Sequence, residues 1–254
     1  MRDEPVAASL MKLGIPTMIG MLISALYNAI DAYFVSGLGM SQMGAVSVVF
    51  PIVQIVIGLG MMFGAGASSY ISRLLGKGDN AEANRTASTA LFASIFVGAV
   101  IIAGIMVFLD PVLMSLGATD TILPYARAYA QIYVTGSIIN VFTVTMNNLL
   151  TAQGATRFTM ISMLTGSIIN IILDPILIFG LFGLPKMGIA GAALATVIGQ
   201  IIGCILSAII NVKKNKEISL DMKGFRPNLK TINRIYSFGI PSIIMASISS
   251  VMTF

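Results

Sequence analysis

Two aspartates, Asp31 and Asp174, lie within long runs of apolar residues that could cross a membrane. A carboxylate near the middle of a bilayer is costly unless it is protonated, paired or hydrated. These runs contain no lysine or arginine at comparable depth, so a proton or a bound cation is the remaining means of neutralising the charge. The two aspartates are therefore predicted to exchange a proton or a cation. Alternatively, they are packing residues whose polar atoms are satisfied by neighbouring amides.

The residues around Asp174 strengthen the first interpretation. Asn170 precedes Asp174 by four residues, so both side chains project from one face of a helix. Pro175 cannot donate a backbone N–H and displaces the carbonyl of Ile171. Thr196, within GAALATVIGQ of the next apolar run, could donate to Asp174 or bind an ion through its hydroxyl. Carboxylate, amide, carbonyl and hydroxyl oxygens are hard ligands that suit Na⁺ or a proton.

Asp31 has polar neighbours of its own. Tyr27 and Asn28 precede it by one helical turn and share its face. Asp31 also lies about 15 residues beyond Pro16, or roughly 22 Å along a helix. This distance places Asp31 in the outer half of its apolar run.

Three prolines are candidate hinges. Pro16 ends a Gly-Ile-Pro sequence that is typical of a helix start, where the first-turn N–H groups lack intrahelical partners. Pro51 would kink its helix and release the carbonyl of Ser47. Pro175 would do the same beside Asp174. Kinks also occur in static bundles, so both interpretations stay open.

The composition predicts the helices that must position these residues. The 254 residues are 56% hydrophobic and 10% charged, whereas soluble domains carry about a quarter charged residues. A helix needs about 20 apolar residues to cross a bilayer. Six such spans are expected, at roughly 14–36, 44–71, 87–109, 124–150, 158–182 and 188–212, with a seventh beginning near 234. The chain is thus predicted to be an all-α, multi-pass membrane protein.

Basic residues indicate its orientation. Of 15 Lys and Arg residues, 13 fall on one side of the predicted spans, and only Arg127 and Lys186 fall on the other. Because basic residues are retained in the cytoplasm, the N-terminus and the 213–234 segment are expected inside the cell. The net charge of +5 is spread over loops, so no nucleic-acid partner is expected. The basic 213–234 segment could also bind anionic lipid, although a topology signal accounts for it.

An internal repeat predicts a second lobe. LGIP at 13–16 recurs as FGIP at 238–241, an offset of 225 that also pairs Ile19 with Ile244 and Ser24 with Ser249. Such parallel repeats enter the membrane from the same side. We expect a six-helix lobe at 1–212, a cytoplasmic basic loop at 213–233 and the start of a seventh helix at 234–254. The chain would then be a piece of a protein about twice as long.

Enzyme and cofactor chemistry have little support. The chain contains no histidine, the commonest general base. Its one cysteine, Cys204, lies in an apolar stretch and has no partner for a disulfide. We therefore expect no enzymatic activity and no cofactor beyond a coupling H⁺ or Na⁺.

Several motifs together resemble the multidrug and toxic compound extrusion (MATE) family. They are LGIP and NAIDAYFVSGLG in the first span, SRLLGKGDNAEANR after the second, QGATR after the fourth, NIILDPILIFG in the fifth and GIAGAALATVIGQ in the sixth. The resemblance implies twelve helices in two six-helix lobes around a V-shaped cavity. It also implies a first-lobe coupling site, which could hold Na⁺, at Asp31, Asn170, Asp174 and Thr196. Further candidates for the substrate cavity are Tyr27, Asn28, Tyr133 and Asn148.

The expected function is secondary active export. A complete protein in the cell membrane would export cationic or amphipathic compounds in exchange for H⁺ or Na⁺, with the second lobe and the bilayer as partners. One alternative is a lipid-linked oligosaccharide flippase, which would be expected to line its cavity with Arg or Lys. The others are a membrane enzyme, disfavoured by the lack of histidine, and a non-transporting assembly partner, which would have no need of two buried carboxylates.

Overall fold

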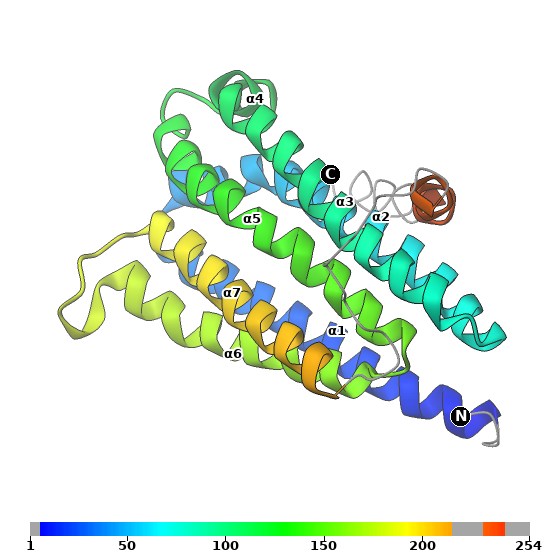
Figure 1. The fold of residues 1–254 in the computed structure, drawn as a ribbon. Coiled ribbons are helices and arrows are strands. Elements are labelled where there is room, and N and C mark those ends of the chain that lie inside the picture. Colours follow the sequence, from blue (N-terminus) through cyan, green and yellow to red (C-terminus); the bar gives the residue numbers. More distant parts are fainter. Residues whose placement is uncertain (1–5, 215–230, 242–254) are drawn as a thin grey trace.

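The computed structural model describes residues 6–214 and 231–241, which form helices joined by turns, without a β-strand. The labelled elements are α1 (Val6–Ser36), α2 (Met40–Lys77), α3 (Asn80–Val107), α4 (Leu109–Ser115), α5 (Leu123–Ala152), α6 (Thr156–Phe179), the short 3₁₀ helix η1 (Leu181–Gly183) and α7 (Ile189–Lys214). A further helix covers 231–241. The predicted all-α class is confirmed, and the long helices run side by side as a bundle (Figure 1).

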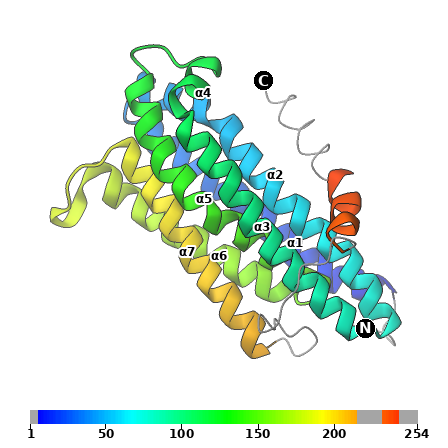
Figure 2. The same ribbon diagram turned by 45° about the horizontal axis from the view of Figure 1, so that its top comes forward.

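Five helices are long and apolar enough to cross a membrane. They are α1 from Met11, α2, α3, α6, and α7 to Asn211. The remaining predicted span, the fourth at 124–150, coincides with α5, a helix of 30 residues with more polar character. Helix α5 packs against α2, α3 and α7, and none of residues 136–150 is exposed (Figures 1 and 2). A helix enclosed by others can carry polar residues that a lipid-facing helix cannot.

The polar segment 73–85 lies between the predicted spans 44–71 and 87–109, and the two helices continue through most of it. Helix α2 runs to Lys77 and α3 begins at Asn80. Gly78 closes α2 with a φ of 80°, a left-handed conformation that glycine adopts readily. The side chain of Asp79 then caps α3 by accepting from the backbone N–H of Glu82 at 3.1 Å. A polar helix end that lies outside a membrane has the same low hydropathy as a loop, so hydropathy alone does not distinguish the two.

The predicted helix start at Pro16 is wrong. Helix α1 begins at Val6, so Pro16 lies inside it, as Pro51 and Pro175 lie inside α2 and α6. The ten residues before Pro16 are mostly good helix formers. Proline has a φ compatible with the helix and removes only one backbone hydrogen bond, so the helix continues through it.

The connection around Pro111 contains the short helix α4, which the hydropathy pattern did not indicate. Asp110 in its first turn pairs with Arg127 of α5, whose Nε donates to Oδ1 at 2.8 Å. An acidic residue in a first turn also complements the helix dipole. Asp110 and Asp120 lie in this connection, far along the chain from Asp31 and Asp174.

Helix 231–241 begins three residues before the predicted seventh span and packs against α2. Ile235 is buried in the same apolar cluster as Phe63 and Ile71, and the rings of Phe63 and Tyr236 meet edge to face at 5.6 Å. Most of the predicted loop, 213–233, and the predicted segment beyond 241 lie outside the described residues. The predicted division of the chain into lobe, loop and second lobe stays a prediction.

Candidate functional site

Helices α6 and α7 meet with their backbones in contact. A Cβ atom added at Gly199 would lie 2.6 Å from the carbonyl oxygen of Gly166, and one added at Gly191 would lie 2.6 Å from that of Leu177. Only glycine fits at such a distance, and small residues allow this close approach in membrane helices. The contact brings the face of α6 that carries Asn170 against the face of α7 that carries Thr196.

A hydrogen-bonded network links the two helices. The side-chain nitrogen of Asn170 donates to Oδ1 of Asp174 and to Oγ1 of Thr196, both at 3.3 Å. Thr196 in turn donates to the carbonyl of Ala192 at 3.1 Å. Asp174 is fully buried, and Asn170 is 3% exposed. Thr196 therefore reaches Asp174 through Asn170 rather than by donating to it directly.

Asp31 of α1 completes this group from a third helix. Its carboxyl group lies close enough to that of Asp174 for the two to interact directly. Three buried oxygens of the cluster, Asp31 Oδ1, Asp174 Oδ2 and Asn170 Oδ1, have no hydrogen-bond partner among the described residues. Unsatisfied buried oxygens are costly, and a small cation or a proton could satisfy them.

Two tyrosines stand beside the carboxyl pair. Tyr27 precedes Asp31 by one turn of α1. The ring of Tyr133 in α5 stacks on Tyr129 at 6.0 Å, and its hydroxyl lies near the side chain of Gln200. Tyr133 lies close enough to Tyr27 and Asp31 to interact with them electrostatically. The structure thus brings both predicted tyrosines to the cluster.

A cavity of 310 Å³ adjoins the cluster between α1, α5, α6 and α7. Four of the predicted residues line it: Tyr27, Asn28, Asn170 and Thr196. Because Asn170 also bonds to Asp174, it joins the cavity to the carboxyl pair. Among the described residues, no group of three or more His, Cys, Asp or Glu could hold a metal ion, so any cation here would need the amide and hydroxyl oxygens as well.

Other polar lining residues were missed by the sequence analysis. They are Ser24, Asn140, Thr143, Asn147, Ser162, Ser167 and Gln200. Gln200 could have been found, since it follows Thr196 by one turn within the same motif. The side chain of Asn147 accepts from the hydroxyl of Ser207 at 2.7 Å, which joins α5 to α7 at the cavity.

The predicted Asn148 faces elsewhere. Its side chain donates to the carbonyl of Val144 at 2.9 Å and packs against Gly64 of α2. It does not line the cavity, whereas its neighbour Asn147 does. Of the three candidate hinges, only Pro175 adjoins the carboxyl pair, directly after Asp174 in α6.

Comparison with known proteins identifies the family to which this chain belongs. The MatE family model matches residues 16–176. The multidrug export protein MepA of Staphylococcus aureus is 33% identical over 96% of this chain, and the chain spans 53% of MepA. A crystal structure of MATE in complex with MaD3S superposes with a TM-score of 0.90 at 32% identity, covering 97% of this chain and 55% of that one.

An outward-facing multidrug resistance MATE transporter of the MOP superfamily has a TM-score of 0.89 at 32% identity, with 97% of this chain and 54% of that one covered. The chain therefore spans about half the length of the relatives it matches. Because the family model covers well over half of the chain and the fold agrees throughout, this chain belongs to the MatE family of membrane transporters.

Proposed function

We propose that the complete protein is a secondary antiporter that exports cationic or amphipathic compounds in exchange for H⁺ or Na⁺. The contact between the carboxyl groups of Asp31 and Asp174 carries the proposal. Two negative charges at this distance in a low-dielectric interior repel each other strongly. A proton or a cation held between them removes the repulsion, so the ion's arrival and departure can drive a change of state.

The coupling ion would be held by oxygens from three helices. Asp31 and Asp174 supply the charge, while Asn170 and Thr196 supply an amide and a hydroxyl oxygen. These are ligands that Na⁺ accepts, and the same carboxylates could take up a proton. No cofactor besides this ion is needed.

The adjoining cavity is the proposed place for the exported compound. Asn170 and Thr196 line the cavity and also belong to the carboxyl cluster. A ligand in the cavity and an ion at the carboxylates would therefore act on the same two side chains. Coupling requires that each ligand bind the protein's two states unequally, and shared residues provide a direct means.

The proposed orientation is supported by the distribution of the basic residues. The excess of Lys and Arg at the end of the bundle that holds the start of α1 supports a cytoplasmic N-terminus in the cell membrane. A second six-helix lobe is the expected partner. The multidrug export role of the relatives points away from an enzyme, and the residues that line the cavity include no Arg or Lys, which disfavours the flippase.

Separately imposed ion gradients test the proposal. The complete protein is placed in vesicles loaded with an ethidium-like dye, and either a pH gradient or a Na⁺ gradient is applied alone. We expect dye movement with at least one of the two gradients. The movement should stop when that gradient is collapsed. Dye movement that ignores both gradients would exclude an H⁺ or Na⁺ antiporter.

Substituting Asn147 is expected to weaken binding of the exported compound in the cavity. The Asn147→Ala variant removes a polar cavity residue and its bond to Ser207, so the dye concentration for half-maximal efflux should rise by about fivefold, the worth of roughly one hydrogen bond. Thr135→Ala is the matched control, because Thr135 lies in the same helix, is exposed, and bonds only within α5. Equal values for the two variants would exclude Asn147 from the binding cavity.

A further inference from the structure

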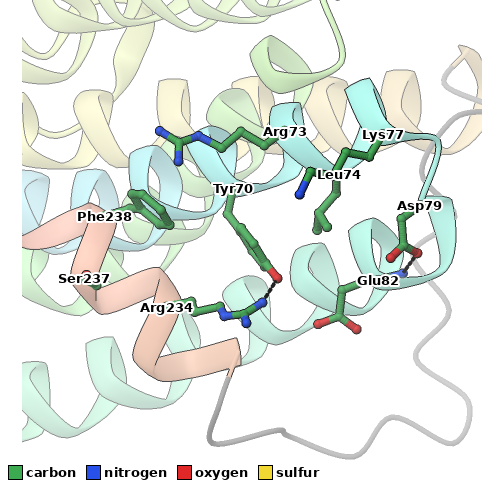
Figure 3. A pocket seen from close by; sticks show the side chains of 9 residues that line it. All are labelled: Tyr70, Arg73, Leu74, Lys77, Asp79, Glu82, Arg234, Ser237 and Phe238. Atoms are coloured by element: carbon green, nitrogen blue, oxygen red, sulfur yellow. Dashed lines mark hydrogen bonds between the residues drawn. The ribbon is translucent and has the colours of Figure 1, made fainter.

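A second pocket, which shares no residue with the carboxyl cluster, lies near the turn between α2 and α3. It has a volume of 940 Å³ and is formed by the last turns of α2, the first turn of α3 and helix 231–241 (Figure 3). The transport proposal assigns no role to this pocket. By the proposed orientation, it opens at the cytoplasmic end of the bundle.

The wall between α2 and helix 231–241 is closely packed. A Cβ atom added at Gly66 would lie 2.3 Å from the carbonyl oxygen of Ile235, and one added at Gly239 would lie 2.2 Å from that of Met62. The rings of Tyr70 and Phe238 stack at 6.2 Å beside this contact. The rings of Tyr70 and Phe238 therefore form an aromatic floor to the pocket, and they come from two segments that are distant in the sequence.

Three basic side chains surround that floor. The guanidinium of Arg73 lies 4.9 Å above the ring of Phe238, and that of Arg234 lies 5.3 Å from the ring of Tyr70 and donates to its hydroxyl. Lys77 lines the pocket one turn beyond Arg73. All three are exposed, and within residues 6–214 and 231–241 the only ion pair is Asp110 with Arg127.

The two acidic residues that line the pocket have other partners. Asp79 caps α3 through the N–H of Glu82 (Figure 3). Glu82 accepts from the hydroxyl of Thr231 at 3.3 Å. The lining thus has one more positive charge than negative. Arg73 and Arg234 rest against aromatic rings rather than carboxylates, so these two groups and Lys77 remain available to an anion.

We propose that this pocket binds the phosphate headgroup of an anionic phospholipid. Helix α2 carries no charged residue before Arg73 and has a second basic residue at Lys77, so the pocket lies where a bilayer changes from acyl chains to headgroups. Tyrosine is enriched at this level. Basic pockets between membrane helices on the cytoplasmic side bind phosphorylated headgroups. The assignment of the headgroup to the cytoplasmic leaflet rests on the proposed orientation. The binding itself rests on the pocket alone.

A bound headgroup would join two parts of the chain. Its phosphate would contact Arg73 and Lys77 from α2 and Arg234 from helix 231–241. The lipid would therefore strengthen the contact between the first six helices and the helix that follows them. Retention of the lipid should depend on basic residues from both sides of the pocket.

Lipid retention tests the site without any transport measurement. The complete protein is reconstituted in symmetric nanodiscs of phosphatidylcholine with a minor share of phosphatidylglycerol, extracted in mild detergent, and analysed by mass spectrometry for lipid per protein. Selective retention of phosphatidylglycerol is expected. Lys77→Gln should lower it by about fivefold, and Arg73→Gln with Lys77→Gln by about 25-fold, since each basic residue near the surface contributes a similar factor.

The control removes the same charge at the same end of the bundle. Arg157→Gln with Lys213→Gln alters two exposed basic residues at the start of α6 and the end of α7, outside the pocket. Retention should stay within twofold of the unsubstituted protein. Equal losses for the two pairs, equal retention of both lipids, or binding of inorganic phosphate without retention of phosphatidylglycerol would overturn the proposal. Because Lys77 bonds to no described side chain, its substitution should not unfold the protein.

Discussion

Replacing Asp31 with Asn in the complete protein is expected to lower dye efflux by on the order of 5- to 150-fold, the usual range when coupling between two ligands is lost. Asparagine has the shape of aspartate and carries no charge. It therefore resembles the neutralised carboxyl group permanently and can neither release a proton nor attract a cation. Efflux from cells that express the variant, normalised to the amount of protein in the membrane fraction, measures the effect.

The contact between the two carboxyl groups sharpens this test. Because Asp31 and Asp174 belong to one cluster, the double variant Asp31→Asn with Asp174→Asn should lose little more efflux than either single variant. Residues that act as one unit give such non-additive losses. Losses that multiply would indicate two independent sites.

Asp120→Asn is the matched control for this chemical change. Asp120 is exposed in the connection before α5, so its substitution removes a carboxylate without touching the cluster. It should insert and export dye like the unsubstituted protein. Undiminished efflux by Asp31→Asn, with insertion intact, would remove Asp31 from the coupling site.

Much of the fold could be predicted from hydropathy, because a helix that crosses a membrane needs one continuous run of apolar residues. The expected runs 158–182 and 188–212 agree closely with α6 and α7. Hydropathy failed where helices leave the apolar region. The ends of α2 and α3 at Lys77 and Asn80 are polar and helical at once, so their residues resembled a loop.

The candidate site could be predicted only within single helices. The four-residue spacing of Asn170 and Asp174 determines that they share a face, and their hydrogen bond is present. The contact of Asp174 with Asp31 depends on how α1 packs against α6, which no local pattern encodes. The family resemblance, rather than the spacing, suggested that these residues form one site.

The choice between Asn147 and Asn148 shows a second limit. Adjacent residues on a helix point about 100° apart, so an apolar stripe normally decides which one faces the interior. Helix α5 is enclosed along residues 136–150 and has no such stripe. Only the packing of α5 against α2 on one side and α7 on the other places Asn147 at the cavity.

The close contact of α6 with α7 leads to the second large expected effect. The Gly199→Ala variant would place a methyl group 2.6 Å from the carbonyl oxygen of Gly166 and 3.2 Å from the Cβ of Asn170. A backbone atom cannot turn aside as a flexible side chain can, so the two helices must separate. Overpacking of this kind costs about 1–3 kcal/mol, which should appear as a lower midpoint of thermal unfolding.

Gly58→Ala is the matched control for that substitution. Gly58 is also buried inside a membrane helix, and a Cβ atom there would meet nothing within 4 Å. Alanine in a helix interior is favoured over glycine by about 0.5–1 kcal/mol, so this variant should be as stable as the unsubstituted protein or slightly more so. Equal stability of the two variants would contradict the described approach of α6 to α7.

The Gly199→Ala variant should also lose transport, because separating the helices lengthens the 3.3 Å bond from Asn170 to Thr196. Thr196→Val distinguishes this cause from general instability. Valine keeps the shape of threonine and leaves the glycine contact intact, but it lacks the hydroxyl that accepts from Asn170. Efflux per folded protein should therefore fall in both variants, with the drop in unfolding midpoint confined mainly to Gly199→Ala. Normal efflux by Thr196→Val would mean that the glycine contact supports the bundle's stability and that the bond between α6 and α7 has no part in coupling.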